Sequence, residues 1–133
     1  MNEWERLFSN AENSALIVAE RDVINRISDA ARKAKLALFR LDLSRVAGKR
    51  TFLKAAAESL GFPNYFGANW DAFEDCLTDL SWHEAEGYVL LIENVEDFAN
   101  GAPGEIKTAR SIFEDAAEYW KGRGVPFFVI LAT

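Results

Sequence analysis

Three carboxylates in one short segment, Asp71, Glu74 and Asp75, are the residues whose types and spacing point most directly to chemistry. In a helix, Asp71 and Asp75 would lie roughly 40° apart around the axis and about 6 Å apart along it, with Glu74 close to both. Like charges at this spacing destabilise a helix by about 0.2–0.5 kcal/mol. We therefore interpret the cluster as a surface that serves something outside the helix.

The residues around these carboxylates predict the helix that positions them. Trp70, Phe73, Leu77 and Leu80 recur at helical spacing and would form one apolar stripe against a core. Asn69 is a favourable N-cap residue. The helix is expected to start there and to extend through Leu80, with Asp79 one turn beyond the three carboxylates on its outer face.

Acidic residues are concentrated in the middle of the chain. No Lys or Arg occurs from Ala55 to Ile106, a span with eleven Asp and Glu residues, and the net charge of the chain is −6. If this segregation persists in space, the resulting field would attract cationic partners and repel nucleic acid. The alternative is that these acids form a solvated surface that only keeps the protein soluble.

Length and composition indicate one small globular domain. The chain has 133 residues, of which 50% are hydrophobic, and a single cysteine, which excludes an internal disulfide. No signal-peptide pattern is visible, and the apolar runs of about five residues are too short to span a bilayer. We expect a cytoplasmic protein that is monomeric when free.

Short apolar runs alternate with helical patterns along the chain. Strands are predicted at 15–19, 36–43, 88–92 and 126–131, helices at 21–35, 49–60, 69–80 and 106–120, and a loop at 93–103. Strands that are apolar throughout and separated by helices are typical of a parallel sheet with right-handed crossovers. The predicted fold class is α/β, a short parallel sheet covered by helices.

Most catalytic and cofactor-binding classes lack support in the sequence. No glycine-rich nucleotide motif or nucleophile elbow is present, and Cys76 and His83 are the only soft metal ligands. Cys76 lies on the apolar side of its helix and is interpreted as structural, and His83 as a surface residue. A general acid–base pair formed by Asp71 and Asp75 remains an alternative. We expect no catalytic residue, no metal and no cofactor.

The segment Pro63–Leu77, PNYFGANWDAFEDCL, resembles the core motif of the barstar family, which is roughly P-x-Y-[YF]-G-x-N-x-D-A-[LFW]-x-D-C-L. The resemblance extends over residues 36–133. It implies three core strands and a non-enzymatic function, the inhibition of a microbial ribonuclease. In the family this helix and the loop before it plug the cationic active site of the nuclease. By this resemblance Asp75 is the central phosphate-mimicking carboxylate, with Asp71 beside it, and Tyr65, Gly67 and Asn69 are binding-loop positions.

The chain also departs from the family pattern. Glu74 replaces an aromatic residue between the two aspartates, and Ala68 replaces an acidic loop residue. Trp82 is the candidate substitute for a family tryptophan after the helix, and the acid late in the family's long helix falls near Tyr119. Residues 1–35 form an additional strand–helix unit, which we expect to add a strand at an edge of the sheet.

These observations predict a protein inhibitor, of the antitoxin or immunity type, that binds a ribonuclease or a ribonuclease-like toxin through Tyr65, Gly67, Asn69, Asp71, Glu74, Asp75 and Trp82. The alternative function is a barstar-like interaction module with a basic partner that is not a nuclease.

Overall fold

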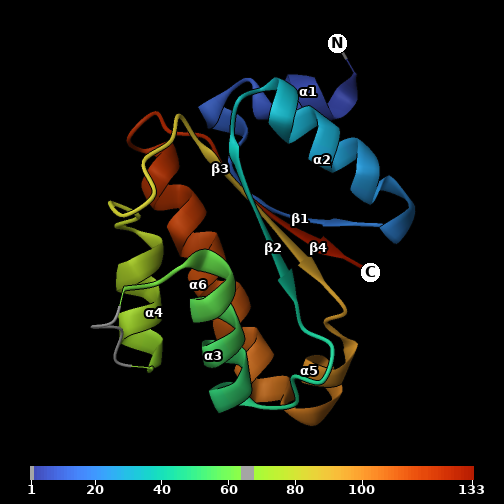
Figure 1. The fold of residues 1–133 in the computed structure, drawn as a ribbon, viewed down its shortest axis with the longest axis vertical. Helices are drawn as coiled ribbons and strands as arrows, with labels where there is room; N and C mark the ends of the chain where they lie inside the picture. The colour runs from blue at the N-terminus through green and yellow to red at the C-terminus, as the bar shows by residue number, and fades with distance from the viewer. Residues whose placement is uncertain (1, 64–67) are drawn as a thin grey trace.

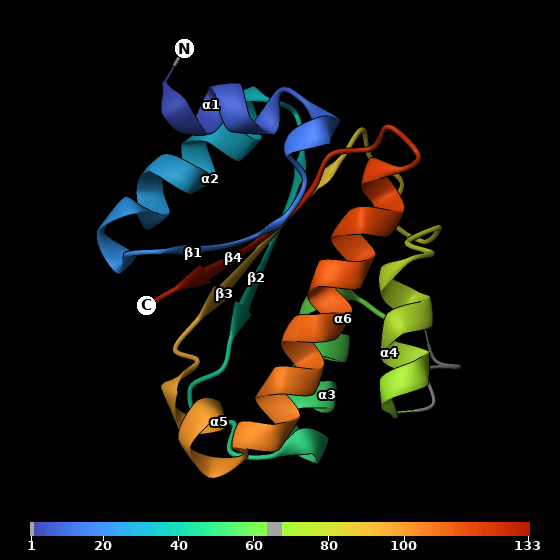
Figure 2. The same cartoon turned by 180° about the vertical axis from the view of Figure 1, so that it is seen from behind.

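The computed structural model describes residues 2–63 and 68–133, which fold around one parallel sheet (Figures 1 and 2). The strands are β1 (Leu16–Ala19), β2 (Ala37–Asp42), β3 (Tyr88–Glu93) and β4 (Phe127–Ala132). All neighbouring pairs are parallel, and the strand order is β1-β4-β3-β2. The α/β class, the three core strands and the additional N-terminal strand at an edge are confirmed.

Helices cover both faces of this sheet. They are α1 (Glu3–Phe8), α2 (Ile24–Lys33), α3 (Lys49–Leu60), α4 (Trp70–Leu77), α5 (Glu96–Gly101) and α6 (Pro103–Lys121), with 3₁₀ turns η1 (Ala11–Asn13) and η2 (Arg21–Val23). α1 and α2 lie on one face, whereas α3, α4 and α6 lie on the other (Figures 1 and 2). α4 packs on the outer side of α6, so it is the element of that layer farthest from the sheet.

Burial of the strands explains their uniformly apolar sequences. All six residues of β4 and the first five of β3 are buried, because helices cover both faces of these central strands. β2 instead alternates in burial from Phe39 onward, with Phe39 and Leu41 buried and Arg40 and Asp42 exposed. This alternation is typical of a strand at the border of the sheet.

One predicted loop is wrong. Residues 96–101 form the helix α5, and its single buried side chain is Phe98, which stacks on Phe52 of α3 with ring centroids 4.9 Å apart. The turn-forming residues Asn100, Gly101 and Pro103 led to the loop prediction. Packing of one aromatic ring into the core outweighs the weak local helix propensity of this segment.

The N-terminal unit joins the same sheet. β1 pairs with β4 in the register Leu16↔Val129, and Ser14, which is buried, accepts the backbone N–H of Phe127 at 2.9 Å. Phe8 of α1 is buried against Phe128.

No helix within residues 2–63 and 68–133 has the length and apolar character needed to cross a bilayer.

Candidate protein-binding site on helix α4

The start of α4 is fixed by its cap. The Asn69 side-chain oxygen accepts the backbone N–H of Ala72 at 2.8 Å, as the sequence predicted. Asp71 lies in the first turn, where the helix dipole favours a negative charge. The helix is shorter than predicted, because it ends at Leu77 and the hydroxyl of Thr78 donates to the carbonyl of Glu74.

Aromatic packing holds the inner face of α4. Phe73 has no exposed surface, and its ring contacts the rings of Phe52, Phe62 and Phe113 at centroid distances of 5.4, 6.0 and 5.5 Å. Cys76 and Leu77 are buried beside it. The predicted apolar stripe is therefore confirmed for these residues, and it orients the opposite face of the helix toward solvent.

Two indole hydrogen bonds attach the ends of α4 to α6. Trp70 Nε1 donates to Glu105 Oε2 at 3.0 Å, and Trp120 Nε1 donates to the carbonyl of Leu77 at 2.9 Å. The second bond satisfies one of the carbonyls that a helix C-terminus leaves without an intrahelical partner. Sequence patterns identified Trp70 and Trp120 only as apolar, because the indole N–H partners come from elements distant in the chain.

The outer face of α4 carries the three carboxylates. Asp71 and Asp75 are exposed and Glu74 is half-buried. None of the three forms an ion pair with any residue that the structure describes. Asp79 is not one turn further on this helix as predicted, because it lies beyond the C-terminus of α4, where it accepts a hydrogen bond from Ser81. The acidic surface of α4 is therefore shorter than predicted, because Asp79 is not part of it, but it retains Asp71 and Asp75.

The acids near the C-terminal end of residues 55–106, the span without Lys or Arg, have a different environment. Glu93 accepts from Arg40 Nε at 2.8 Å, Glu96 pairs with Arg21, and the Asp97 carboxylate accepts the backbone N–H of Arg45 at 3.3 Å. The expectation that the acidic span stays apart from the basic residues in space is wrong here. The fold places the side chains of Arg40, on β2, and Arg21, in η2, beside two of these acids, whereas the contact of Asp97 with Arg45 is through the backbone.

The remaining predicted site residues are only partly placed. Tyr65 and Gly67 lie outside the described residues. Trp82 is half-buried, with its Nε1 donating to the carbonyl of Leu60 at 3.3 Å and its ring edge-on to Phe62 at 5.8 Å. These contacts give Trp82 a structural role. Its contact with a partner protein remains a prediction.

Cys76 has the properties of a structural thiol. Burial raises the pKa of Cys76, and the nearby negative charges of Asp79 and Asp75 raise it further. A raised pKa keeps the thiol protonated and weakly nucleophilic. Across residues 2–63 and 68–133, no three His, Cys, Asp or Glu side chains converge as metal ligands would.

Tyr119, near which the family pattern places an acid, lies among charged side chains of both signs. Tyr119 of α6 has the guanidinium of Arg123 over its ring, with Cζ 3.7 Å from the centroid, and the neighbouring Glu118 is 4.0 Å from Lys121 Nζ. Tyr119 also packs edge-on against Trp120, which holds the C-terminus of α4. The surface beyond the C-terminus of α4 therefore carries positive charges, on Arg123 and Lys121, and a negative charge, on Glu118.

Comparisons with known proteins agree with this architecture. Among solved structures, the ORC2 protein of Aeropyrum pernix, solved as ADPNP–ADP complexes, superposes with a TM-score of 0.60 at 16% sequence identity. The match covers 97% of this chain and 39% of that one, so the chain spans about two fifths of the length of that protein. At this sequence identity the likeness concerns the fold only. The search of curated proteins found no match. The family model described as Barstar (barnase inhibitor) matches residues 36–132, from β2 to β4 and including α4, and the chain therefore belongs to the barstar family.

Proposed function

We propose that this protein inhibits a microbial ribonuclease or ribonuclease-like toxin, and that α4 and the loop before it plug the cationic active site of that enzyme. The observation that carries the proposal is the pair Asp71 and Asp75, exposed on one helical face without an ion-pair partner among the described residues. The family match supplies the class of partner. The protein acts by binding and catalyses no reaction.

Carboxylates on a rigid helix suit a site that binds RNA phosphates. Such a site presents Arg, Lys and His donors, and charge-assisted hydrogen bonds to carboxylates are stronger than neutral ones. The family's namesake, barstar in complex with barnase, binds through this kind of electrostatic complementarity, which acts strongly on the association rate. Asp75, in the last turn of α4, is assigned the central contact and Asp71, in the first turn, the adjacent one.

The support behind α4 limits the entropy that binding would cost. The ring cluster around Phe73 and the indole bonds of Trp70 and Trp120 fix the helix before any partner arrives. A surface that is ordered in advance loses little conformational freedom on association. We assign Glu74 a supplementary charged contact.

Four further residues complete the proposed surface. Asn69 caps the helix and lies beside the loop, and Tyr65 and Gly67 are assigned to the interface by the family motif. Trp82 is assigned to its border, because it is half-buried against Phe62, which lies just ahead of that loop.

The test is the cleavage of a fluorogenic RNA by a small secreted microbial ribonuclease, titrated with this protein. Stoichiometric inhibition is expected for the wild type, and Asp75→Ala should weaken it by at least about a hundredfold, since a central charged contact is lost. Glu12→Ala is the matched control, because it removes one exposed carboxylate from η1, a turn of the N-terminal unit that lies outside α4. This control should inhibit like the wild type.

The outcomes separate the two candidate functions. Equal loss of inhibition in Asp75→Ala and Glu12→Ala would show that net charge, and not the α4 surface, controls binding. Absence of inhibition, together with salt-sensitive binding of another basic protein through Asp75, would favour the module with a non-nuclease partner. Turnover of a substrate that depends on Asp71 and Asp75 would contradict the assignment as an inhibitor.

A further inference from the structure

The strand β2 has a backbone edge that is free for pairing. Ala37 N–H donates to Gly87 and Leu43 N–H donates to Glu93, both at 2.9 Å, so alternate residues from 37 to 43 direct their backbone groups toward β3. The backbone N–H and C=O groups of Leu38, Arg40 and Asp42 consequently point away from the sheet. No other strand of the described chain pairs with this edge. A row of unpaired backbone groups is a template for an additional strand.

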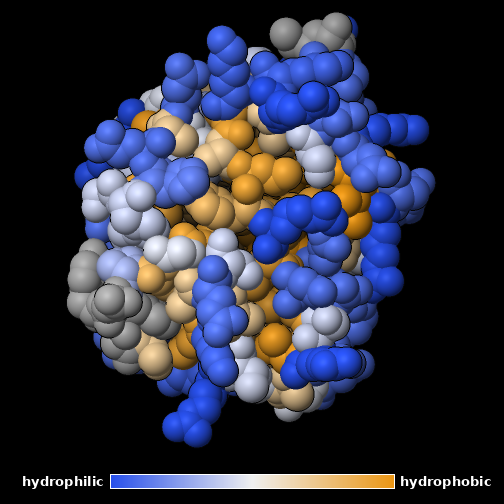
Figure 3. Space-filling model, in the orientation of Figure 1, coloured by the Kyte–Doolittle hydropathy of each residue, from blue (hydrophilic) through white to orange (hydrophobic). Residues whose placement is uncertain are grey.

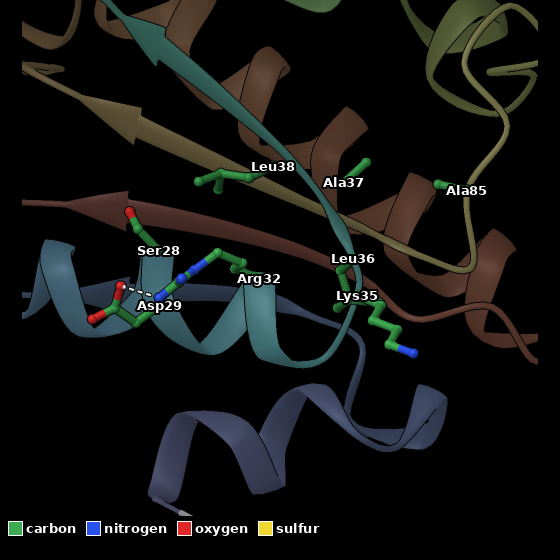
Figure 4. A pocket seen from close by; sticks show the side chains of 8 residues that line it. All are labelled: Ser28, Asp29, Arg32, Lys35, Leu36, Ala37, Leu38 and Ala85. Carbon is green, nitrogen blue, oxygen red and sulfur yellow. Dashed lines mark hydrogen bonds and ion pairs between the residues drawn. The ribbon is translucent and has the colours of Figure 1, made fainter.

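A hollow lies beside this edge, between β2 and α2 (Figure 4). It is open to solvent and has a volume of about 630 Å³. Its lining residues are Ser28, Asp29, Arg32, Lys35, Leu36, Ala37, Leu38 and Ala85. In Figure 3, apolar surface gathers over the region where β2 crosses the view, with hydrophilic side chains around it. The hollow thus combines an apolar floor with a border that carries two cations, Arg32 and Lys35, and one carboxylate, Asp29.

Two polar side chains at the hollow, those of Ser28 and Lys35, have no partner among the described residues, and a third, that of Arg32, has only an exposed one. The Ser28 hydroxyl is buried and makes no hydrogen bond with a described residue. Lys35 forms no ion pair with the residues described here, and Arg32 pairs with Asp29 at 3.1 Å while both side chains remain more than half exposed. An exposed pair of this kind contributes little energy and can exchange partners readily. The two cations are therefore available to a ligand.

We propose that this edge and hollow bind an extended acidic peptide segment of a partner protein, which adds to the sheet as a fifth strand beside β2. Backbone hydrogen bonds to Leu38 and Arg40 would supply affinity, as in other cases of strand addition. Alternate side chains of the added strand would enter the hollow beside Leu38. Acidic side chains on that face would reach Arg32 and Lys35, which supplies the preference for negative charge.

Charge argues against a second copy of this chain as the occupant. Pairing two β2 edges would bring the Arg32 and Lys35 side chains of one copy toward those of the other, and like charges that face each other are destabilising. Successive residues of a strand face opposite sides of the sheet, so the matching peptide carries apolar and acidic residues in turn at every second position, the positions that face α2. The peptide is thus the occupant that fits the lining.

This site is independent of α4. The hollow involves α2 and the outer edge of β2, whereas α4 lies on the other face of the sheet, beyond α6 (Figures 1 and 2). The proposed peptide and a partner of α4 could therefore bind together. A peptide effect that persists in Asp75→Ala would show that the two surfaces are separate.

The experiment uses the full chain and a fluorescein-labelled heptapeptide, Val-Thr-Glu-Thr-Val-Thr-Glu, followed by fluorescence polarisation. As a strand this peptide has its valine and glutamate side chains on one face and its threonine side chains on the other. Saturable binding is expected, and the variant Arg32→Glu with Lys35→Glu should weaken it by about tenfold or more. Arg26→Glu is the matched control, because it reverses an exposed cation of α2 outside the hollow. Its dissociation constant should stay within about twofold of the wild type, a difference of less than about 0.5 kcal/mol.

Location is tested by amide hydrogen exchange. The peptide should slow exchange at Leu38 and Arg40, whose N–H groups point outward, and leave Phe39, already bonded to β3, unchanged. The proposal is overturned if the glutamate peptide does not bind, if the same heptapeptide with lysine in place of glutamate binds equally well, or if Arg26→Glu weakens binding as much as the double variant. A concentration-dependent dimer that the double variant abolishes would instead identify a second copy as the occupant.

Discussion

Two sets of carboxylates in this protein have opposite surroundings. The sheet-end acids, Glu93, Glu96 and Asp42, lie near the carboxyl ends of β2 and β3, and each has a partner: Arg40, Arg21 and the Asn94 amide. The helix acids, Asp71, Glu74 and Asp75, have no ion-pair partner among the described residues. The count of acids along the sequence does not show which of them are available to another molecule.

Topology produces this difference. Adjacent strands bring an arginine on β2 beside a glutamate on β3, although 53 positions separate them in the chain. α4 is instead an outer helix that contacts its neighbours through apolar side chains and indole groups. Its carboxylates have no ion-pair partner among the described residues, whereas the sheet-end acids bond to other parts of the fold.

The largest expected effect is the loss of the aromatic support beneath the helix acids. Phe73→Ala removes a fully buried ring that contacts three other phenylalanine rings, and it should lower the free energy of unfolding by about 3–5 kcal/mol. Chemical denaturation measures this change. The matched variant Glu74→Ala, on the outer side of the same helix, should change stability by less than about 0.5 kcal/mol. Equal losses would show that α4 is not held by its inner face.

A smaller effect is expected from one of the hydrogen bonds that fix the helix ends. Trp120→Phe keeps an aromatic ring but removes the donor to the Leu77 carbonyl, which should cost about 1–2 kcal/mol because a partly buried acceptor loses its partner. Amide exchange in the last turn of α4 should accelerate. If exchange there stays unchanged while global stability falls, the indole acts through ring packing rather than by holding α4.

Much of this organisation could be predicted from sequence, and the exceptions share a cause. The apolar runs located all four strands, the periodic pattern gave Lys49–Leu60 for α3, and Asn69 gave the cap of α4. The helix α5 could not be predicted, because its stability comes from Phe98 packing on Phe52. The Arg40–Glu93 pair could not be predicted either, since it depends on strand order. Each exception is a contact between distant segments.

Replacing a carboxylate with its neutral amide compares the sheet-end acids with the helix acids directly. Glu93→Gln should lower the free energy of unfolding by about 0.5–1 kcal/mol, because the Glu93 side chain is 21% exposed and bonded to Arg40. Asp75→Asn should leave stability unchanged or raise it by about 0.2–0.5 kcal/mol, since it relieves repulsion from Asp71. Thermal unfolding at low salt measures both changes. Equal destabilisation by the two substitutions would remove the proposed distinction between structural and available acids.

The smallest expected effect is the response of a sheet-end acid to pH. Hydrogen bonds from the Asn94 amide and then from Ser44 lower the pKa of Asp42 below its value in the unfolded chain, about 3.9. Folding therefore favours the ionised form. The resulting stabilisation is present above about pH 4 and disappears as the pH falls through the lower folded pKa.

Removing either partner of this bond should flatten that part of the stability curve. Asp42→Asn should show a smaller loss of stability than the wild type as the pH falls below about 4. Asn94→Gly removes the main donor, and glycine accepts the left-handed backbone that Asn94 adopts at φ 57°. NMR titration of the Asp42 carboxyl carbon should show its pKa rising in Asn94→Gly. An unchanged pKa in that variant would mean that the contact with Asn94 does not favour the ionised form, and Asp42 would then belong with the available acids.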